Sequence, residues 1–147
     1  MSYTSRVSER MYPLAYEHAD SQAIGTHNSA CVSLQNYHRA WLVLNVGDMG
    51  VGATLDAGLQ QATNTACAGV KAIAGKTITT LTQAGGDGND LVCIELQTEE
   101  LDVDNAFDCV RFYVTIAGAD VEYSAILYGL ISRYKAVPIT NWTEIVG

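Results

Sequence analysis

Apolar and polar side chains alternate along several stretches of this chain. In the run 39–46, Leu42 and Leu44 share one face, and Arg39 and Asn45 fall on the other. An alternation of period two is typical of a strand with one buried face. Similar patterns predict strands over 54–60, 91–97 and 109–116, and the β-branched run 77–82 predicts another.

Turn-forming residues separate these stretches, with Gly and Asp gathered at 47–50 and 85–90. Short strands with turn signals every 8–12 residues or so are typical of a sandwich. The length of 147 residues fits one domain. We therefore expect an all-β, single-domain sandwich of the jelly-roll type over 37–147. An extended N-terminal arm and the first strand or strands would occupy 1–36.

The stretch 121–134 is largely apolar on both faces, as a central strand or a strand at an interface would be. An exposed apolar face of this kind indicates a contact with another subunit. The candidate contact residues are Tyr123, Ile126, Leu127, Tyr128 and Leu130.

The charge of the chain is uneven. The net charge is −8, and the whole acidic excess lies in 77–110, which holds eight acids and no Lys or Arg. Binding to nucleic acid requires clustered Lys and Arg, so we expect neither nucleic acid nor an anionic membrane as a partner. No apolar run approaches the roughly 20 residues of a membrane span, and the polar start predicts no secretory signal.

An acidic cluster lies within this segment and allows several interpretations. Its carboxylates could bind a divalent cation, act as an acid and base pair on a glycoside, form a solvated loop, or dock on a basic partner. The spacing does not fit a calcium-binding loop, and no Ser or Cys is paired with a His in a catalytic pattern. We expect no enzyme activity, no metal and no cofactor. The cluster comprises Glu95, Glu99, Glu100, Asp102, Asp104 and Asp108.

The four cysteines are Cys31, Cys67, Cys93 and Cys109, and their spacing lacks the close pairs of a zinc site. By alternation, Cys93 and Cys109 fall on the polar faces of two consecutive predicted strands. If those strands are neighbours, the two thiols could form a disulfide. Bridges that involve Cys67 or Cys31, bridges between subunits, and four free thiols are the alternatives.

Two groups of segments, read in order, resemble a known set of proteins. The first comprises Tyr37-His-Arg-Ala-Trp-Leu-Val-Leu-Asn-Val-Gly47, Gly52-Ala-Thr-Leu-Asp-Ala-Gly-Leu-Gln-Gln-Ala62 and Lys71-Ala-Ile-Ala-Gly-Lys-Thr-Ile-Thr-Thr-Leu-Thr82. The second comprises Glu99-Glu-Leu-Asp-Val103, Phe107-Asp-Cys-Val-Arg-Phe-Tyr-Val-Thr-Ile-Ala117, Leu127-Tyr-Gly129 and Arg133-Tyr134. Over about 37–138, this order resembles small structural proteins encoded near the head genes of tailed bacteriophages.

The resemblance implies a virion component, in particular a head decoration (cement) protein that binds the major capsid protein on the capsid exterior. Assembly would take place in the host cytoplasm, and the three-fold sites of capsids suggest a homotrimer. A neck or tail component is the alternative within the same class. The cysteines depart from the usual pattern, and 1–36 shows no match.

A carbohydrate-binding module is the alternative from another class, because jelly-roll sandwiches also serve as lectin domains. Sugar binding favours exposed aromatic side chains. The chain has eight Tyr and two Trp, one of which, Trp142, lies near the C-terminus.

Overall fold

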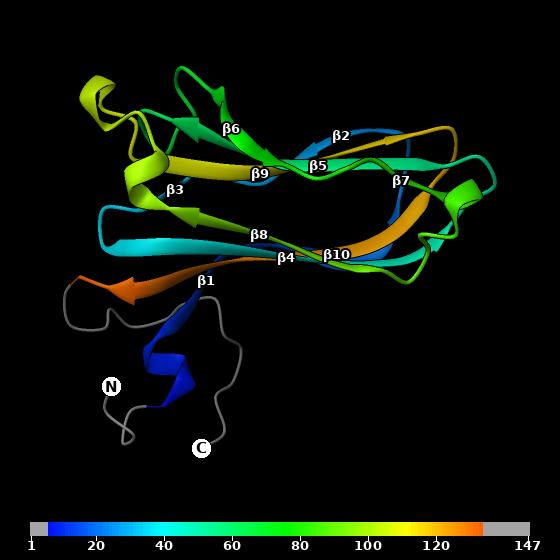
Figure 1. Ribbon diagram of the computed structural model, residues 1–147, viewed down its shortest axis with the longest axis horizontal. Coiled ribbons are helices and arrows are strands. Elements are labelled where there is room, and N and C mark those ends of the chain that lie inside the picture. Colours follow the sequence, from blue (N-terminus) through cyan, green and yellow to red (C-terminus); the bar gives the residue numbers. More distant parts are fainter. Residues whose placement is uncertain (1–5, 134–147) are drawn as a thin grey trace.

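A computed structural model describes residues 6–133 of the chain (Figure 1). This part contains ten strands: β1 (Met11–Gln22), β2 (Gly25–Asn28), β3 (Val32–Ser33), β4 (Tyr37–Met49), β5 (Thr54–Ala62), β6 (Lys71–Thr77), β7 (Leu81–Thr82), β8 (Leu91–Gln97), β9 (Cys109–Ala117) and β10 (Val121–Ser132). Its four helices are single 3-10 turns: η1 (Val7–Glu9), η2 (Gln83–Gly85), η3 (Thr98–Glu100) and η4 (Val103–Asn105). The all-β prediction is confirmed. No helix in the described part is long and apolar enough to cross a membrane.

The strands form two antiparallel sheets that lie one above the other (Figure 1). The four-stranded sheet has the order β1-β10-β4-β8. The six-stranded sheet has the order β2-β9-β5-β6, with β3 paired to β9 and β7 paired to β5. Most connections cross from one sheet to the other, and two facing sheets of this order make a jelly-roll sandwich. The predicted sandwich is therefore confirmed.

The core lies between the sheets and is built from alternate residues of each strand. In β4, Leu42 and Leu44 are each 1% exposed, whereas Asn45, on the opposite face of the same strand, is exposed to solvent. Leu59 and Phe112, from the facing sheet, belong to the same buried apolar cluster as these two leucines. The alternation that predicted a half-buried strand at 39–46 is therefore confirmed, and the strand extends beyond it at both ends.

The N-terminal segment, for which we expected an extended arm and the first strand or strands, contributes strands to the sandwich. Strand β1 pairs with β10 along its length, and β2 pairs with β9, so residues 11–28 contribute to both sheets. Tyr12 and Ala15 are buried. Register shifts in β1, one of them beside Pro13, break the period of two that would have revealed the strand. Pro13 is tolerated because β1 is an edge strand of its sheet.

The strand predicted over 77–82 is also corrected. Strand β6 ends at Thr77, and only Leu81–Thr82 forms the short β7. Strand β6 lies at the edge of its sheet and buries only Ile73, so its sequence shows no alternation. Gly75, with a φ of 72°, adds an irregular backbone position.

Candidate interaction surfaces

The outer face of the four-stranded sheet carries apolar side chains across all four strands. The register places Tyr16 opposite Ile126, Ile126 opposite Val43, and Val43 opposite Cys93. Ile126 and Val43 are half-buried, while Tyr16 and Cys93 at the sides are exposed. We call these four residues the apolar row. It forms a continuous strip on the side of the sheet turned away from the core.

A pair of aromatic rings lies beside the apolar row. Tyr128 of β10 is opposite Trp41 of β4, with ring centroids 6.1 Å apart and planes inclined at 35°. Leu130 follows on the same face, opposite Arg39. The outer face therefore combines an aromatic pair with an aliphatic strip.

The structure divides the predicted subunit contact into two sets. Tyr123 and Leu127 are 2% and 0% exposed and belong to the core, which corrects their assignment to a contact. Ile126, Tyr128 and Leu130 lie on the outer face and are half-buried. The inner side of β10 is apolar because it lies in the core, and its outer side carries the three half-buried apolar residues. Tyr134, the end of the predicted strand, lies outside the described residues.

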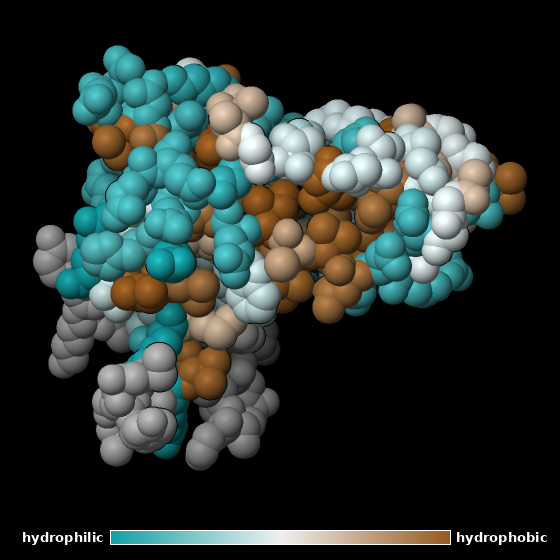
Figure 2. Space-filling model, viewed as in Figure 1, coloured by the Kyte–Doolittle hydropathy of each residue, from teal (hydrophilic) through white to brown (hydrophobic). Residues whose placement is uncertain are grey.

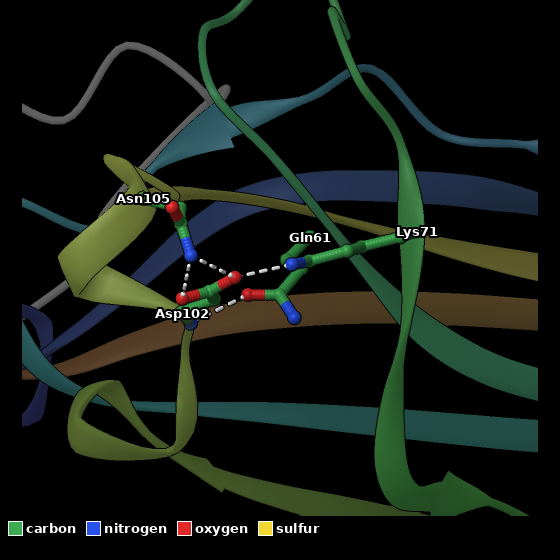
Figure 3. Close-up of polar contacts among 4 residues, drawn as sticks. All are labelled: Gln61, Lys71, Asp102 and Asn105. Carbon is green, nitrogen blue, oxygen red and sulfur yellow. Dashed lines mark hydrogen bonds and ion pairs between the residues drawn. The ribbon is translucent and has the colours of Figure 1, made fainter.

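The acidic loop, residues 98–108, connects β8 to β9 at one end of the sandwich. Figure 3 shows how Asp102 anchors it. The Asp102 carboxylate accepts hydrogen bonds from the Lys71 ammonium and from the Asn105 amide at 2.9 and 3.0 Å. The backbone N–H of Asp102 donates a hydrogen bond to Oε1 of the buried Gln61 at 2.8 Å. The hydrogen bond from Lys71, followed by those from Asn105, lowers the pKa of Asp102.

A second lysine of β6 neutralises a second acid of the loop. Nζ of Lys76 lies 2.8 Å from Oε2 of Glu100, which also accepts the Gln97 backbone N–H at 2.8 Å. The hydrogen bond from Lys76 is the main cause that lowers the pKa of Glu100. Lys71 in turn lies 4.0 Å from the centroid of the Phe107 ring. These cations come from outside 77–110, which is why the charge count along the chain did not reveal the pairing.

The remaining acids of the predicted cluster point in several directions. Glu99 and Asp104 are exposed on the loop, and Glu95 is exposed on β8. Asp108 accepts a hydrogen bond from the Gln35 amide. Within residues 6–133, no group of three or more His, Cys, Asp or Glu side chains is arranged to hold a metal ion. The loop therefore exposes Glu99 and Asp104 to solvent, while Asp102 and Glu100 hold its shape.

The cysteines pair differently from the bridge suggested by their alternation. A disulfide joins Cys31 to Cys67, with Cα atoms 5.5 Å apart, and Cys93 and Cys109 are free thiols. Cys93 and Cys109 cannot bridge as neighbours, because β8 and β9 belong to different sheets. Cys93 is exposed as predicted from its face.

Cys109 is buried rather than on a polar face. It packs with Cys31 and Ala62 in a small cluster against Cys67 and Val70, so the loop after β5 covers the outer side of β9 there. Burial, followed by the effect of Asp108, raises the pKa of Cys109 to about 11. The thiol is therefore held protonated beside the disulfide.

These features define the class of the protein as a single jelly-roll β-sandwich. No known protein family matches the chain, and no curated protein matches it either. Among solved structures, a chain from the structure of infectious bursal disease virus, Gx strain, has a TM-score of 0.41 and 11% sequence identity to this chain. The match covers 86% of this chain and 33% of that chain, so this chain spans about a third of its length.

Proposed function

We propose that this protein is a structural component of a tailed-phage virion, and specifically a decoration protein that binds the major capsid protein on the head exterior. The observation that carries the proposal is the apolar row, which crosses every strand on the outer face of the four-stranded sheet. Contiguous apolar surface of this kind marks an interaction site. The resemblance of residues 37–138 to structural proteins of tailed phages supports a phage virion as the assembly to which this protein would belong.

The outer face fits a contact between copies of this chain. Ile126, Val43 and the Trp41–Tyr128 pair supply the aliphatic and aromatic groups that are enriched at the centre of interfaces. We propose a homotrimer held by this face. Its symmetry would match the three-fold positions of a capsid.

The acidic loop fits the contact with the capsid. Glu99 and Asp104 are exposed, and carboxylates at the rim of an interface select a basic partner surface. A protein that binds the assembled shell and not its separate subunits stabilises the shell through mass action. Three loops on one trimer would bind together through their effective concentration. The proposed role is structural and not catalytic, and the protein would join the virion in the host cytoplasm.

Cosedimentation with purified phage heads that lack this protein tests the proposal. The wild-type chain should pellet with the heads, and the double variant Glu99→Lys, Asp104→Lys should bind at least about tenfold more weakly. The control is Asp48→Lys with Asp90→Lys, two exposed acids away from the acidic loop that change the net charge equally. Equal loss in both variants would contradict docking by the loop, and a wild-type chain that stays in the supernatant would contradict the decoration role.

A neck or tail position is the alternative within the same class. Labelled protein located on intact particles by electron microscopy distinguishes the two. Density on the head faces supports the decoration role, and density confined to the neck or tail supports the alternative.

A second candidate function is carbohydrate binding, which one observation favours. The Trp41–Tyr128 pair lies on a sheet face beside a cavity of about 130 Å³ that Arg39, Glu95 and Gln97 help to line. Aromatic side chains beside a few polar groups are a typical lining of a small-molecule site, and a sugar is the ligand that a jelly-roll sandwich suggests. A glycan array with the wild-type chain and Trp41→Ala tests it, and signals that depend on Trp41 would favour this function.

A further inference from the structure

A hollow of about 360 Å³ lies at the end of the sandwich that carries the acidic loop. Its apolar lining, from this loop and from the turn after β3, consists of Leu34, Leu101, Val103 and Phe107, and we call it the loop hollow. The first two and Phe107 are at most 9% exposed, whereas Val103 is 60% exposed. Figure 2 shows mostly hydrophilic surface at this end, interrupted by a small hydrophobic patch. Ligand pockets have volumes of about 300–1,000 Å³, so the loop hollow is large enough for an apolar side chain of a partner.

Hydrogen bonds hold the walls of the loop hollow in place. The Leu34 N–H donates to the Asp108 carbonyl at 2.8 Å, which ties the turn after β3 to the acidic loop. Within the loop, the Phe107 N–H donates to the Asp102 carbonyl at 3.1 Å, and the Asp102 side chain is anchored to Lys71. The hollow is therefore formed before a partner binds, which lowers the cost of ordering it on binding.

Carboxylates without a cationic partner lie beside the apolar lining. Glu99 and Asp108 line the loop hollow, and the exposed Asp104 directly follows Val103. Neither Glu99 nor Asp108 forms an ion pair with a residue in 6–133. Asp108 accepts its side-chain hydrogen bond from a neutral amide, that of Gln35. The negative charge at the hollow is thus not neutralised in the way that the lysines of β6 neutralise the rest of the loop.

Arg133 is the one cation of the described residues that lines the loop hollow, and its donors are directed to neutral acceptors. Nη2 of Arg133 donates to Oγ1 of Thr98 at 3.0 Å, and Nε donates to the Tyr37 carbonyl at 3.1 Å. The carboxylates of Glu99 and Asp108 are therefore available to a cation that comes from another molecule.

We propose that the loop hollow docks a surface segment of a partner protein in which an apolar side chain has an Arg or Lys beside it. The apolar side chain enters the hollow, and the cation contacts Glu99 or Asp108. Anchors that fill pockets contribute most of the energy at interfaces, and opposite charges beside them select the partner. The identity of that partner, the major capsid protein, rests on the proposed function, whereas the chemistry of the segment rests on the hollow alone.

Titration of the isotope-labelled full-length chain with a short peptide tests this chemistry without phage heads. The probe is acetyl-Gly-Arg-Leu-Arg-Gly-amide, and amide chemical shifts report its binding. The shifts should change at Leu101, Val103 and Phe107. Replacing Leu by Ser, or both Arg by Glu, in the peptide should weaken binding at least about tenfold. Unchanged shifts at the loop hollow, or equal binding of all these peptides, would overturn the proposal.

Variants of the chain test the contribution of the carboxylates. Glu99→Gln with Asp108→Asn should weaken binding of the peptide at least about fivefold. Since Glu99 is exposed, Glu99→Gln alone should keep the fold and weaken binding about threefold. The matched control is Glu95→Gln with Asp90→Asn, two exposed acids that do not line the hollow, and it should bind as the wild type does. Equal losses in the control and in the carboxylate variants would contradict a role of the hollow.

Photo-cross-linking on purified phage heads tests the same surface in the assembly. A chain with Val103→p-benzoylphenylalanine should cross-link to the major capsid protein, at a segment with Arg or Lys beside an apolar residue. A cross-link to a second copy of this chain would overturn the proposal. A chain that does not pellet with the heads would contradict the decoration role instead, and the peptide titration would still decide whether the hollow binds such a segment.

Discussion

Gly118 lies so close to Gly52 that a Cβ atom on Gly118 would stand 2.1 Å from the Gly52 carbonyl oxygen. Gly118 directly follows β9, and Gly52 lies between β4 and β5. The contact therefore joins two turns at the same end of the sandwich. Gly118 also has a φ of 82°, in the region that favours glycine.

Replacing Gly118 with Ala should destabilise the fold strongly, because the added Cβ would overlap backbone atoms of Gly52, which cannot shift without a large cost in free energy. The left-handed conformation alone costs about 1–2 kcal/mol, and forced overpacking adds about 1–3 kcal/mol. Gly86 is the matched control, since it has the same φ of 82° and nothing within 4 Å of its Cβ position. Gly86→Ala should lose only the conformational part. Urea unfolding measures both, and equal losses would contradict the importance of the contact.

Replacing Tyr123 with Phe should stabilise the protein. The Tyr123 hydroxyl is buried without a hydrogen-bond partner among the described residues. Its removal relieves an unsatisfied group, and we expect a gain of about 1 kcal/mol. Tyr12→Phe is the control, because the Tyr12 hydroxyl donates to the Glu9 carbonyl at 2.6 Å, and it should lose stability. A loss in both variants, measured by thermal unfolding, would show that the Tyr123 hydroxyl has a partner.

Stability should fall at alkaline pH. Burial and the charge of Glu17 raise the pKa of Tyr123 from 10.0 to about 12, and burial and Asp108 raise the pKa of Cys109 from 9.0 to about 11. Both groups ionise more easily in the unfolded chain. Their contribution is thus complete below pH 9 and is lost as the pH rises through 9 to about 12. Denaturant midpoints against pH should decline less steeply above pH 10 in Tyr123→Phe.

Removing the Cys31–Cys67 disulfide should cost about 2–4 kcal/mol, because it closes a long loop, with 36 residues of sequence separation. The double variant Cys31→Ala, Cys67→Ala tests this under non-reducing conditions. Cys93→Ala, at an exposed free thiol, is the control and should change stability by less than about 0.5 kcal/mol. A double variant as stable as the wild type would contradict a stabilising disulfide.

Polar substitutions in the apolar row should separate the subunits of the proposed trimer. Val43→Ser with Ile126→Ser removes the two central apolar groups of the row while leaving the inner face of the sheet unchanged. Light scattering should then report a monomer. Asn45→Ala, on the same outer face but polar and exposed, should leave the mass unchanged. A wild-type chain that is already monomeric would refute self-association in solution.

The alternation of apolar and polar residues was enough to predict the class of the fold and most of its central strands. The alternation around Leu42 and Leu44 survives in β4 because that strand lies within the sheet and must bury one complete face. Two of the edge strands, β1 and β6, were less visible in the sequence. Bulges interrupt the period in β1, and β6 buries only Ile73, so neither shows a regular pattern.

Which residues far apart in the sequence lie in contact could not be predicted from the alternation and follows from the packing of the two sheets. The crossing connections of the jelly roll place Cys93 and Cys109 in different sheets, although their strands follow each other in the sequence. The same connections bring Cys31 to Cys67, and Lys71 of β6 to Asp102 of the acidic loop. The local pattern reports which face of a strand is buried. It carries no information about which strands become neighbours, because that depends on how the two sheets pack.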